Sequence, residues 1–79
     1  MTQNKEEILG KILQEERKAK KISQEKLAKL TGLDRTFISL IENGKRNPTF
    51  TTILKICSAL ELEPSELFAI AEISNRIRS

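Results

Sequence analysis

Apolar residues recur along this chain at the three- and four-residue spacing that places side chains on one face of a helix. The spacing predicts five helices, over about residues 5–20, 24–30, 35–43, 51–60 and 64–77. Residues that begin or stop helices, such as Ser, Asp, Asn, Gly and Pro, stand between several of them. We therefore expect an all-α fold, in which residues 1–79 form one compact five-helix domain.

The stretch from Ser23 to Pro48 joins two short helices through a tight turn. Ser23 is a good N-cap for the first of them. Gly32 stands where a left-handed residue can end that helix, and Asp34 can cap the next one. Two helices joined by a turn of about three residues are the plan of a helix-turn-helix, here over about residues 23–43. The spacing alone fits an ordinary helical hairpin equally well.

The same periodicity predicts which side chains face the core. The 24–30 helix is expected to turn Leu27, Ala28 and Leu30 inward, and the 35–43 helix Ile38 and Ile41. Phe50 is expected to pack just ahead of the next helix. That helix should bury five apolar side chains, namely Ile53, Leu54, Ile56, Cys57 and Leu60.

The last helix, about residues 64–77, carries more apolar surface than one core-facing stripe requires. A chain of 79 residues is also near the lower limit for burying a core without disulfides, a metal or a partner chain. We therefore expect a homodimer built mainly by this helix. The candidate interface residues are Phe68, Ile70, Ile73 and Ile77.

Charge is distributed unevenly along the chain, whose formal net charge is +3. Residues 1–47 hold eleven Lys and Arg against seven Asp and Glu, whereas residues 48–79 hold three against four. The basic excess therefore lies in the half that carries the two short helices, as suits a nucleic-acid partner. A solvated helix surface would account for an excess of this size as well.

Composition argues against an enzyme. The chain has no His, no Tyr and one Cys, so the usual nucleophile pairs and His/Cys metal sites cannot be built, and we expect no metal and no cofactor. Cys57 lies in an apolar run and is expected to act as a small buried hydrophobe. No segment approaches the roughly 18 apolar residues of a membrane span, and the polar N-terminus is unlike a secretory signal. We expect a cytoplasmic protein.

Polar side chains around the two short helices suit DNA contacts. Arg35 can bond bidentately to guanine, and Thr36 can contact a base through its hydroxyl or its methyl group. Ser39 and Arg46 complete the candidate base contacts, whereas Leu40 offers only van der Waals contact. The candidate backbone contacts at the start of the first short helix and in the turn after the second are Ser23, Gln24, Asn43, Lys45 and Asn47.

Some of these positions have plainer interpretations. Ser23 could serve only as a cap, although both roles can coexist. The turn that contains Asn43 and Lys45 could be merely a solvated loop. Phe37 could pack against the first helix or cover the edge of the DNA site.

Several of these residues carry a resemblance to a known family. Gln24, Gly32, Ile38 and the run from Ile41 to Arg46 resemble the lambda-repressor-like (Xre/Cro-type) helix-turn-helix family. The likeness extends upstream through Leu13 to Leu9-Gly10, and downstream through residues 62–67, so it covers nearly all of the chain. The resemblance implies a five-helix DNA-binding fold and an ion pair between Arg17 and Glu42. Arg17 taken alone could be a surface charge.

The run from Leu33 to Ser39, LDRTFIS, is similar to the signature of the controller proteins of restriction–modification systems. Phe37 stands where that signature has tyrosine, so any contact made by the tyrosine hydroxyl is absent. The resemblance implies a homodimer that binds palindromic double-stranded DNA operators and regulates its own gene together with the endonuclease gene.

Other functions fit the same fold. A general Xre-type or prophage repressor would share the architecture and differ in operator and genetic setting. An antitoxin or a bridging protein-interaction module would not bind duplex DNA selectively by itself. RNA polymerase is a further candidate partner, through Glu25, although that charge could simply stabilise the start of its helix. We expect no small-molecule ligand.

Overall fold

A computed structural model describes residues 5–78, and their side chains as far as Arg76. Its helices are α1 (Lys5–Ala19), α2 (Gln24–Thr31), α3 (Arg35–Glu42), α4 (Phe50–Ala59) and α5 (Pro64–Arg78). Residues 5–78 contain no strand. The prediction of an all-α, five-helix, lambda-repressor-like fold is confirmed. None of the helices in this range is long and apolar enough to cross a bilayer.

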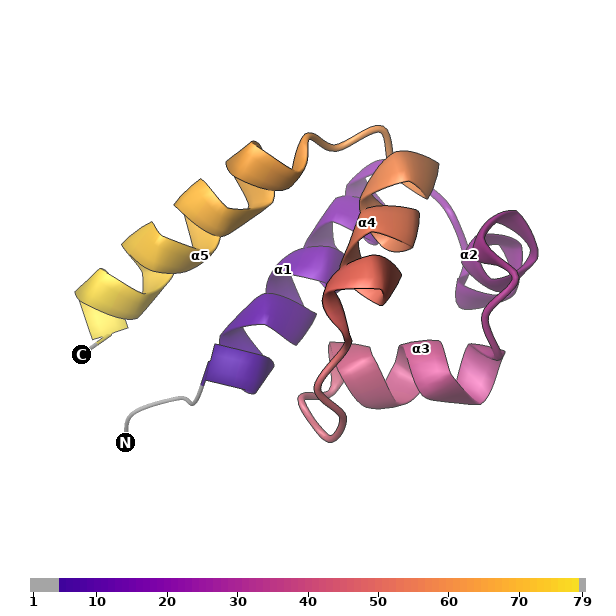
Figure 1. Ribbon diagram of the computed structural model, residues 1–79, viewed down its shortest axis with the longest axis horizontal. Coiled ribbons are helices and arrows are strands. Elements are labelled where there is room, and N and C mark those ends of the chain that lie inside the picture. Colours follow the sequence, from indigo (N-terminus) through magenta and orange to yellow (C-terminus); the bar gives the residue numbers. More distant parts are fainter. Residues whose placement is uncertain (1–4, 79) are drawn as a thin grey trace.

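The first helix is the element around which the others are placed. α1 packs against both α3 and α5, while α2 packs against α3 and α4. Figure 1 shows α3 along the lower edge of the molecule, with α2 beside one end of it and α5 alongside α1 at the upper left. The helix that carries Arg35 and the helix expected to form the dimer therefore lie on different sides of the molecule.

Short polar side chains begin three of the helices. The backbone N–H of Lys26 donates to Ser23 Oγ at 3.0 Å, and the backbone N–H of Thr36 donates to Asp34 Oδ1 at 2.9 Å. Thr49 caps α4 in the same way. Gly32 ends α2 with φ of 75°. The tight turn between α2 and α3 is thus fixed at both ends by local chemistry that the sequence predicts.

The hydrophobic core draws on all five helices. Ile38 and Ile41 of α3 and Leu27 of α2 are almost completely buried, as expected. Cys57 is buried among them, and burial raises the pKa of its thiol, which keeps the thiol protonated. The other fully packed side chains come from α1, from the stripe along α4, and from α5, and they are Ile8, Ile12, Leu13, Ile53, Ile56, Leu60 and Leu67.

Three apolar side chains predicted to be buried are instead exposed. Leu30 is 51% exposed, Leu54 39% and Phe50 63%. Leu54 is one residue away from the stripe of Ile53 and Ile56, so it points about 100° away from the face that α4 buries. Leu30 lies in the last turn of the short helix α2, whose core contact is made by Leu27.

Phe50 is itself the first residue of α4 and does not precede the helix. The buried positions around this helix start are taken by Pro48 and Thr52. The hydroxyl of Thr49 donates to that of Thr52 at 2.9 Å, so the inner surface at this end is closed by small side chains. The Phe50 ring consequently remains outside the core.

The backbones of α1 and α3 approach each other very closely at Gly10. A Cβ atom added to this residue would lie 2.1 Å from the carbonyl oxygen of Ile41 and 3.0 Å from that of Glu42. Because only glycine lacks a Cβ atom, α1 can cross the C-terminal end of α3 at this distance only with glycine here.

We predict that Gly10→Ala lowers the free energy of unfolding by about 3 kcal/mol, because the added methyl group forces α1 and α3 apart. Gly32→Ala is the matched control. A Cβ atom added at Gly32 would face open space. This substitution should therefore lower the free energy of unfolding by only about 1 kcal/mol, because alanine is strained in a left-handed backbone conformation. Urea unfolding followed by circular dichroism measures both losses. Equal losses would contradict the close approach of the two helices.

Candidate nucleic-acid interface

The exposed face of α3 gathers most of the side chains predicted to read bases. Arg35 and Thr36 are exposed at its first turn, and Ser39 is half-buried one turn later. Together with Leu40 and with Gln24 from the start of α2, they line one shallow hollow. The opposite face of α3 is packed into the core, so this helix presents its polar side outward as a unit.

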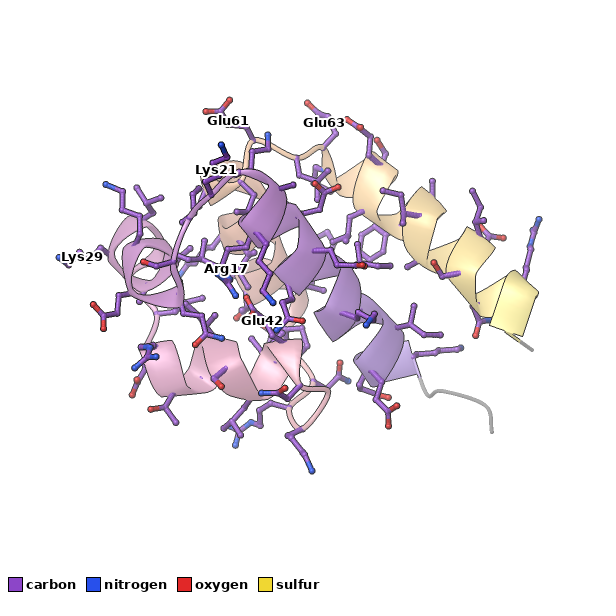
Figure 2. The ribbon with its side chains drawn as sticks, turned by 180° about the vertical axis from the view of Figure 1, so that it is seen from behind. Arg17, Lys21, Lys29, Glu42, Glu61 and Glu63 are labelled. Atoms are coloured by element: carbon purple, nitrogen blue, oxygen red, sulfur yellow. The ribbon has the colours of Figure 1, made fainter. Side chains whose placement is uncertain are left out.

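A buried ion pair holds α3 from behind. Arg17 Nε donates to Glu42 Oε2 at 2.7 Å, and Arg17 Nη2 donates to Glu42 Oε1 at 3.0 Å. Figure 2 shows the two side chains pointing toward each other, Arg17 from α1 and Glu42 from the end of α3. Arg17 Nη1 also donates to the carbonyl oxygen of Ile22 at 2.7 Å. One guanidinium thus joins α1, the segment before α2, and α3.

Gln24 completes this network. Its Nε2 donates to Glu42 Oε1 at 3.0 Å. Within the described residues no buried side-chain nitrogen or oxygen lacks a hydrogen-bond partner, so the charges of the pair are fully compensated. The amide nitrogen of Gln24 keeps its second hydrogen, which is free to reach a phosphate. Gln24 is therefore oriented by the same carboxylate that holds α3.

Ser23 combines its two predicted roles without conflict. Its hydroxyl oxygen accepts the hydrogen bond that caps α2, while its own hydrogen can still donate to another group. The first backbone N–H groups of α2 point the same way as in any helix start, toward an incoming anion. Ser23 and Gln24 therefore place hydrogen-bond donors at the start of α2, and Gln24 lines the hollow.

The turn after α3 supplies the remaining candidates. Lys45, Arg46 and Asn47 are all exposed. Asn43 is exposed as well, but its side-chain amide donates to the carbonyl oxygen of Ser39 at 2.8 Å and so helps to end α3. The same amide nitrogen also donates to Ser39 Oγ at 3.4 Å, so the side-chain oxygen of Asn43 is the atom left for other contacts.

The structure shows the surroundings of Phe37, for which the sequence allowed two interpretations. Its ring is half-buried and packs against the core, and the guanidinium carbon of Arg46 lies 5.6 Å from the ring centre. The packing favours the first of the two interpretations above. The contact with Arg46 was not predicted from the sequence.

The charges around α3 favour an anion. Arg35 lies at one end of the exposed face, and Lys45 and Arg46 lie just beyond the other. Asp34 caps α3 and Glu42 is paired with Arg17, so the carboxylates that belong to α3 and its N-cap both have hydrogen-bond partners. The exposed cations at the two ends of α3 are charges that attract a phosphate backbone.

A second exposed surface lies on α5. Leu67 is buried and Ala71 packs against the core, whereas Phe68 is 43% exposed, Ile70 37% and Ile73 57%. Ile70 and Ile73 thus remain exposed one turn apart on this helix, whereas Phe68 lines a hollow against Ile8 and Leu9 of α1. Ile77 was predicted to belong to the same surface, but its side chain lies outside the described residues.

Nothing in residues 5–78 resembles a metal centre. No group of three or more His, Cys, Asp or Glu side chains lies close enough together to hold an ion. The only cysteine is buried and unpaired.

The likeness to known proteins covers the same elements. The model of the family described as "Helix-turn-helix" matches residues 13–67. Control protein C.BamHI of Bacillus amyloliquefaciens is 41% identical over 76 residues, which cover 95% of this chain and 94% of that protein. The crystal structure of the restriction–modification controller protein C.AhdI from Aeromonas hydrophila superposes with a TM-score of 0.75 at 48% identity, over 77% of this chain and 92% of that one.

The chain belongs to the helix-turn-helix family, among the restriction–modification control proteins. A further member, C.Esp1396I, has been solved as a tetramer in complex with its natural 35 base-pair operator. This chain superposes on it with a TM-score of 0.80 at 30% identity, over 87% of this chain and 91% of that one. The region matched by the family model, residues 13–67, includes all of α2, α3 and α4.

Two contacts of this control protein were not predicted from its sequence. The hydrogen bond from Gln24 to Glu42 joins residues 18 positions apart, and the cation–π contact of Arg46 with Phe37 depends on the course of the turn after α3. Neither pair has the three- or four-residue spacing through which a helix brings side chains together. Only the type of each residue, an amide near a carboxylate and a cation near an aromatic ring, was a signal.

We predict that Glu42→Ala lowers the free energy of unfolding by about 3–5 kcal/mol, because it leaves the Arg17 guanidinium buried without its partner. Replacing both members, with Arg17→Met and Glu42→Leu together, should cost less than that single change, since no charge then remains to be buried. Urea unfolding of both variants tests the pair. A loss below about 1 kcal/mol for Glu42→Ala would mean that the pair is exposed to water in solution.

Proposed function

We propose that this protein is a transcriptional regulator that inserts α3 into the major groove of its operator DNA. The observation that carries the proposal is the hollow lined by Arg35, Thr36, Ser39, Leu40 and Gln24, on a helix that a buried ion pair holds on its inner side. A rigid helix with polar side chains on its outward face is the element that reads base edges in this class of fold.

The proposed base contacts follow from donor geometry. Arg35 presents a planar fork that matches O6 and N7 of guanine, and it stands at the first turn of α3, the part of a recognition helix that enters the groove. Thr36 and Ser39 add hydroxyl groups that can donate or accept. Arg46 reaches from the turn after α3 toward a neighbouring base edge or phosphate.

The proposed backbone contacts come from two segments beside α3. Ser23 and Gln24 hold a phosphate at the start of α2. Asn43, Lys45 and Asn47 meet the backbone from the turn after α3. Contacts from two segments fix the register of the helix in the groove without reading sequence themselves.

The outward apolar side chains of α5 support a homodimer. Phe68, Ile70 and Ile73 are the described residues that would be shared between the two copies, with Ile77 as a further candidate from the sequence. A twofold axis would place the two copies of α3 about 34 Å apart, one turn of DNA, which calls for a palindromic operator. The operator-bound tetramer of C.Esp1396I supports self-association on DNA for this chain as well.

The membership among restriction–modification control proteins supports regulation of the protein's own gene together with an endonuclease gene. Two dimers that fill adjacent sites in turn could first recruit RNA polymerase and then block it. Glu25, exposed at the start of α2, is the candidate contact with polymerase. The occupancy of the two sites would then convert a rising protein concentration into a switch.

We predict that Arg35→Ala removes discrimination at one base position of each half-site, at a cost of about 1–3 kcal/mol per lost bidentate contact. Gln24→Ala should instead weaken operator and random duplex alike, since it removes a phosphate contact. Titrations of both variants with operator and scrambled duplexes at fixed salt separate the two behaviours. If Arg35→Ala lost equal affinity for both duplexes, Arg35 would be a backbone contact.

Ile73→Lys is predicted to give a folded monomer, because a charge on the outer side of α5 cannot be buried between two copies. Its affinity for the operator should fall steeply, since one half-site then binds alone. Sedimentation at tens of micromolar and DNA titration measure the two effects. A wild-type protein that sediments as a monomer yet binds its operator undiminished would exclude this interface.

A reporter driven by the DNA upstream of the gene tests the regulatory role. We expect its output to rise and then fall as the protein is titrated from zero, because activation and repression use sites of different affinity. Monotonic repression would favour a general Xre-type or prophage repressor. No response at any concentration would exclude both regulators and favour an antitoxin or bridging module.

A further inference from the structure

Phe37 and Arg46 form a cation–π contact where α3 meets the turn that follows it. The guanidinium carbon of Arg46 lies 5.6 Å from the centre of the Phe37 ring, within the range of such contacts. The ring is half-buried and rests against the core, so packing fixes it on its inner side. The guanidinium lies over the ring, and Arg46 is itself exposed.

The main chain that carries Arg46 is also fixed. Gly44 has φ of 71°, and its backbone N–H donates to the carbonyl oxygen of Ile41 at 3.0 Å, which closes the end of α3. Pro48, two residues after Arg46, is buried. The turn is therefore anchored on both sides, and the freedom that remains to Arg46 is that of its long side chain.

The Phe37 ring is the contact that limits this freedom. Among residues 5–78, Arg46 makes no hydrogen bond and no ion pair, so nothing else restrains its guanidinium. A cation–π contact uses none of the N–H groups of the guanidinium in a hydrogen bond. Arg46 is thus restrained by the ring while its hydrogen-bond donors remain available for a phosphate or a base edge.

We propose that Phe37 is a positioning residue, whose ring holds Arg46 in the orientation in which Arg46 contacts DNA. The ring reduces the conformational freedom that Arg46 loses on binding, and so it raises affinity without a DNA contact of its own. The inference rests on the proposed function, because it requires that α3 and the turn after it meet the duplex. It assigns to Phe37 a part in binding beyond its packing.

A double-mutant cycle measures the coupling directly. The probe is a duplex made from the DNA immediately upstream of the gene, titrated with the wild type, Phe37→Leu, Arg46→Ala and the variant that carries both changes. We expect Phe37→Leu to weaken binding by about two- to fivefold per protomer when Arg46 is present, and to have little effect when it is absent. Additive losses would overturn the proposal, because the ring would then act only on the fold.

Two variants control for packing. Phe37→Tyr keeps an aromatic ring and should keep the wild-type coupling. A parallel cycle of Phe37→Leu with Lys45→Ala pairs the same change with a neighbouring exposed cation that does not lie over the ring, and it should be additive. Coupling of equal size with Lys45 would reduce the effect to a general disturbance of the turn and overturn the proposal.

Phe37→Met keeps the proposal testable if Phe37→Leu does not fold, as judged by thermal unfolding. Methionine is apolar and long enough to pack against the core, but it has no ring for the Arg46 guanidinium, so the same double-mutant cycle with Arg46→Ala can be measured with it. We expect the coupling seen with Phe37→Leu, whereas additive losses would overturn the proposal.

Two further measurements distinguish a failure of the role proposed for Phe37 from a failure of the proposed function. They are the sign of the affinity change in Phe37→Leu and the preference of the wild type for the upstream duplex. Tighter binding by Phe37→Leu would show that the ring holds Arg46 away from DNA and would overturn the inference alone. If the wild type did not prefer the upstream duplex to a scrambled duplex of the same composition, the proposed function would fail and the inference with it.

Discussion

The ion pair between Arg17 and Glu42 fixes α3 relative to the rest of the molecule. Burying two charges costs several kcal/mol per ion unless each is fully hydrogen-bonded. Here the guanidinium meets both carboxylate oxygens and the carbonyl of Ile22, and the carboxylate also accepts from Gln24. A small rotation or slide of α3 would break this set of bonds. Directional bonds therefore define one position for the helix, where apolar contacts alone would tolerate several.

Close contact between helix backbones makes this pairing possible. Gly10 lets α1 cross the end of α3 with a carbonyl oxygen where a Cβ atom would otherwise lie. Arg17 follows two turns later on α1, near the start of the segment that leads to α2. The ion pair thus joins α1 and α3, whose backbones are already in close contact. The hydrogen bond from Gln24 adds the start of α2 to the same network. The proposed phosphate contact and the proposed base-reading helix share one anchor.

The rest of the fold separates two surfaces. α3 presents polar and cationic side chains on one side, while α5 presents Phe68, Ile70 and Ile73 on another, and α1 packs against both helices (Figure 1). In a dimer built on α5, the distance between the two copies of α3 would therefore depend on the angle between α5 and α1. A change in the packing of α1 against α5 would alter half-site spacing without touching a residue that meets DNA.

The sequence by itself determined the five helices, their caps at Ser23 and Asp34, the left-handed turn at Gly32 and the outward residues at the start of α3. These features depend on neighbours within one helical turn, so their signals are local. The resemblance to a known family added the pairing of Arg17 with Glu42, which spacing could not supply.

Only the tertiary structure decided which of the adjacent apolar residues are covered. Leu54 and Leu30 are as hydrophobic as their buried neighbours, yet they are exposed because they line an open hollow between α2 and α4. In the same way, the bond from Gln24 to Glu42 and the cation–π contact of Arg46 with Phe37 exist because the angles between helices and the course of one turn bring distant residues together. Periodicity defines the faces of each helix, but it contains no information on the distance between two faces, and these contacts depend on that distance.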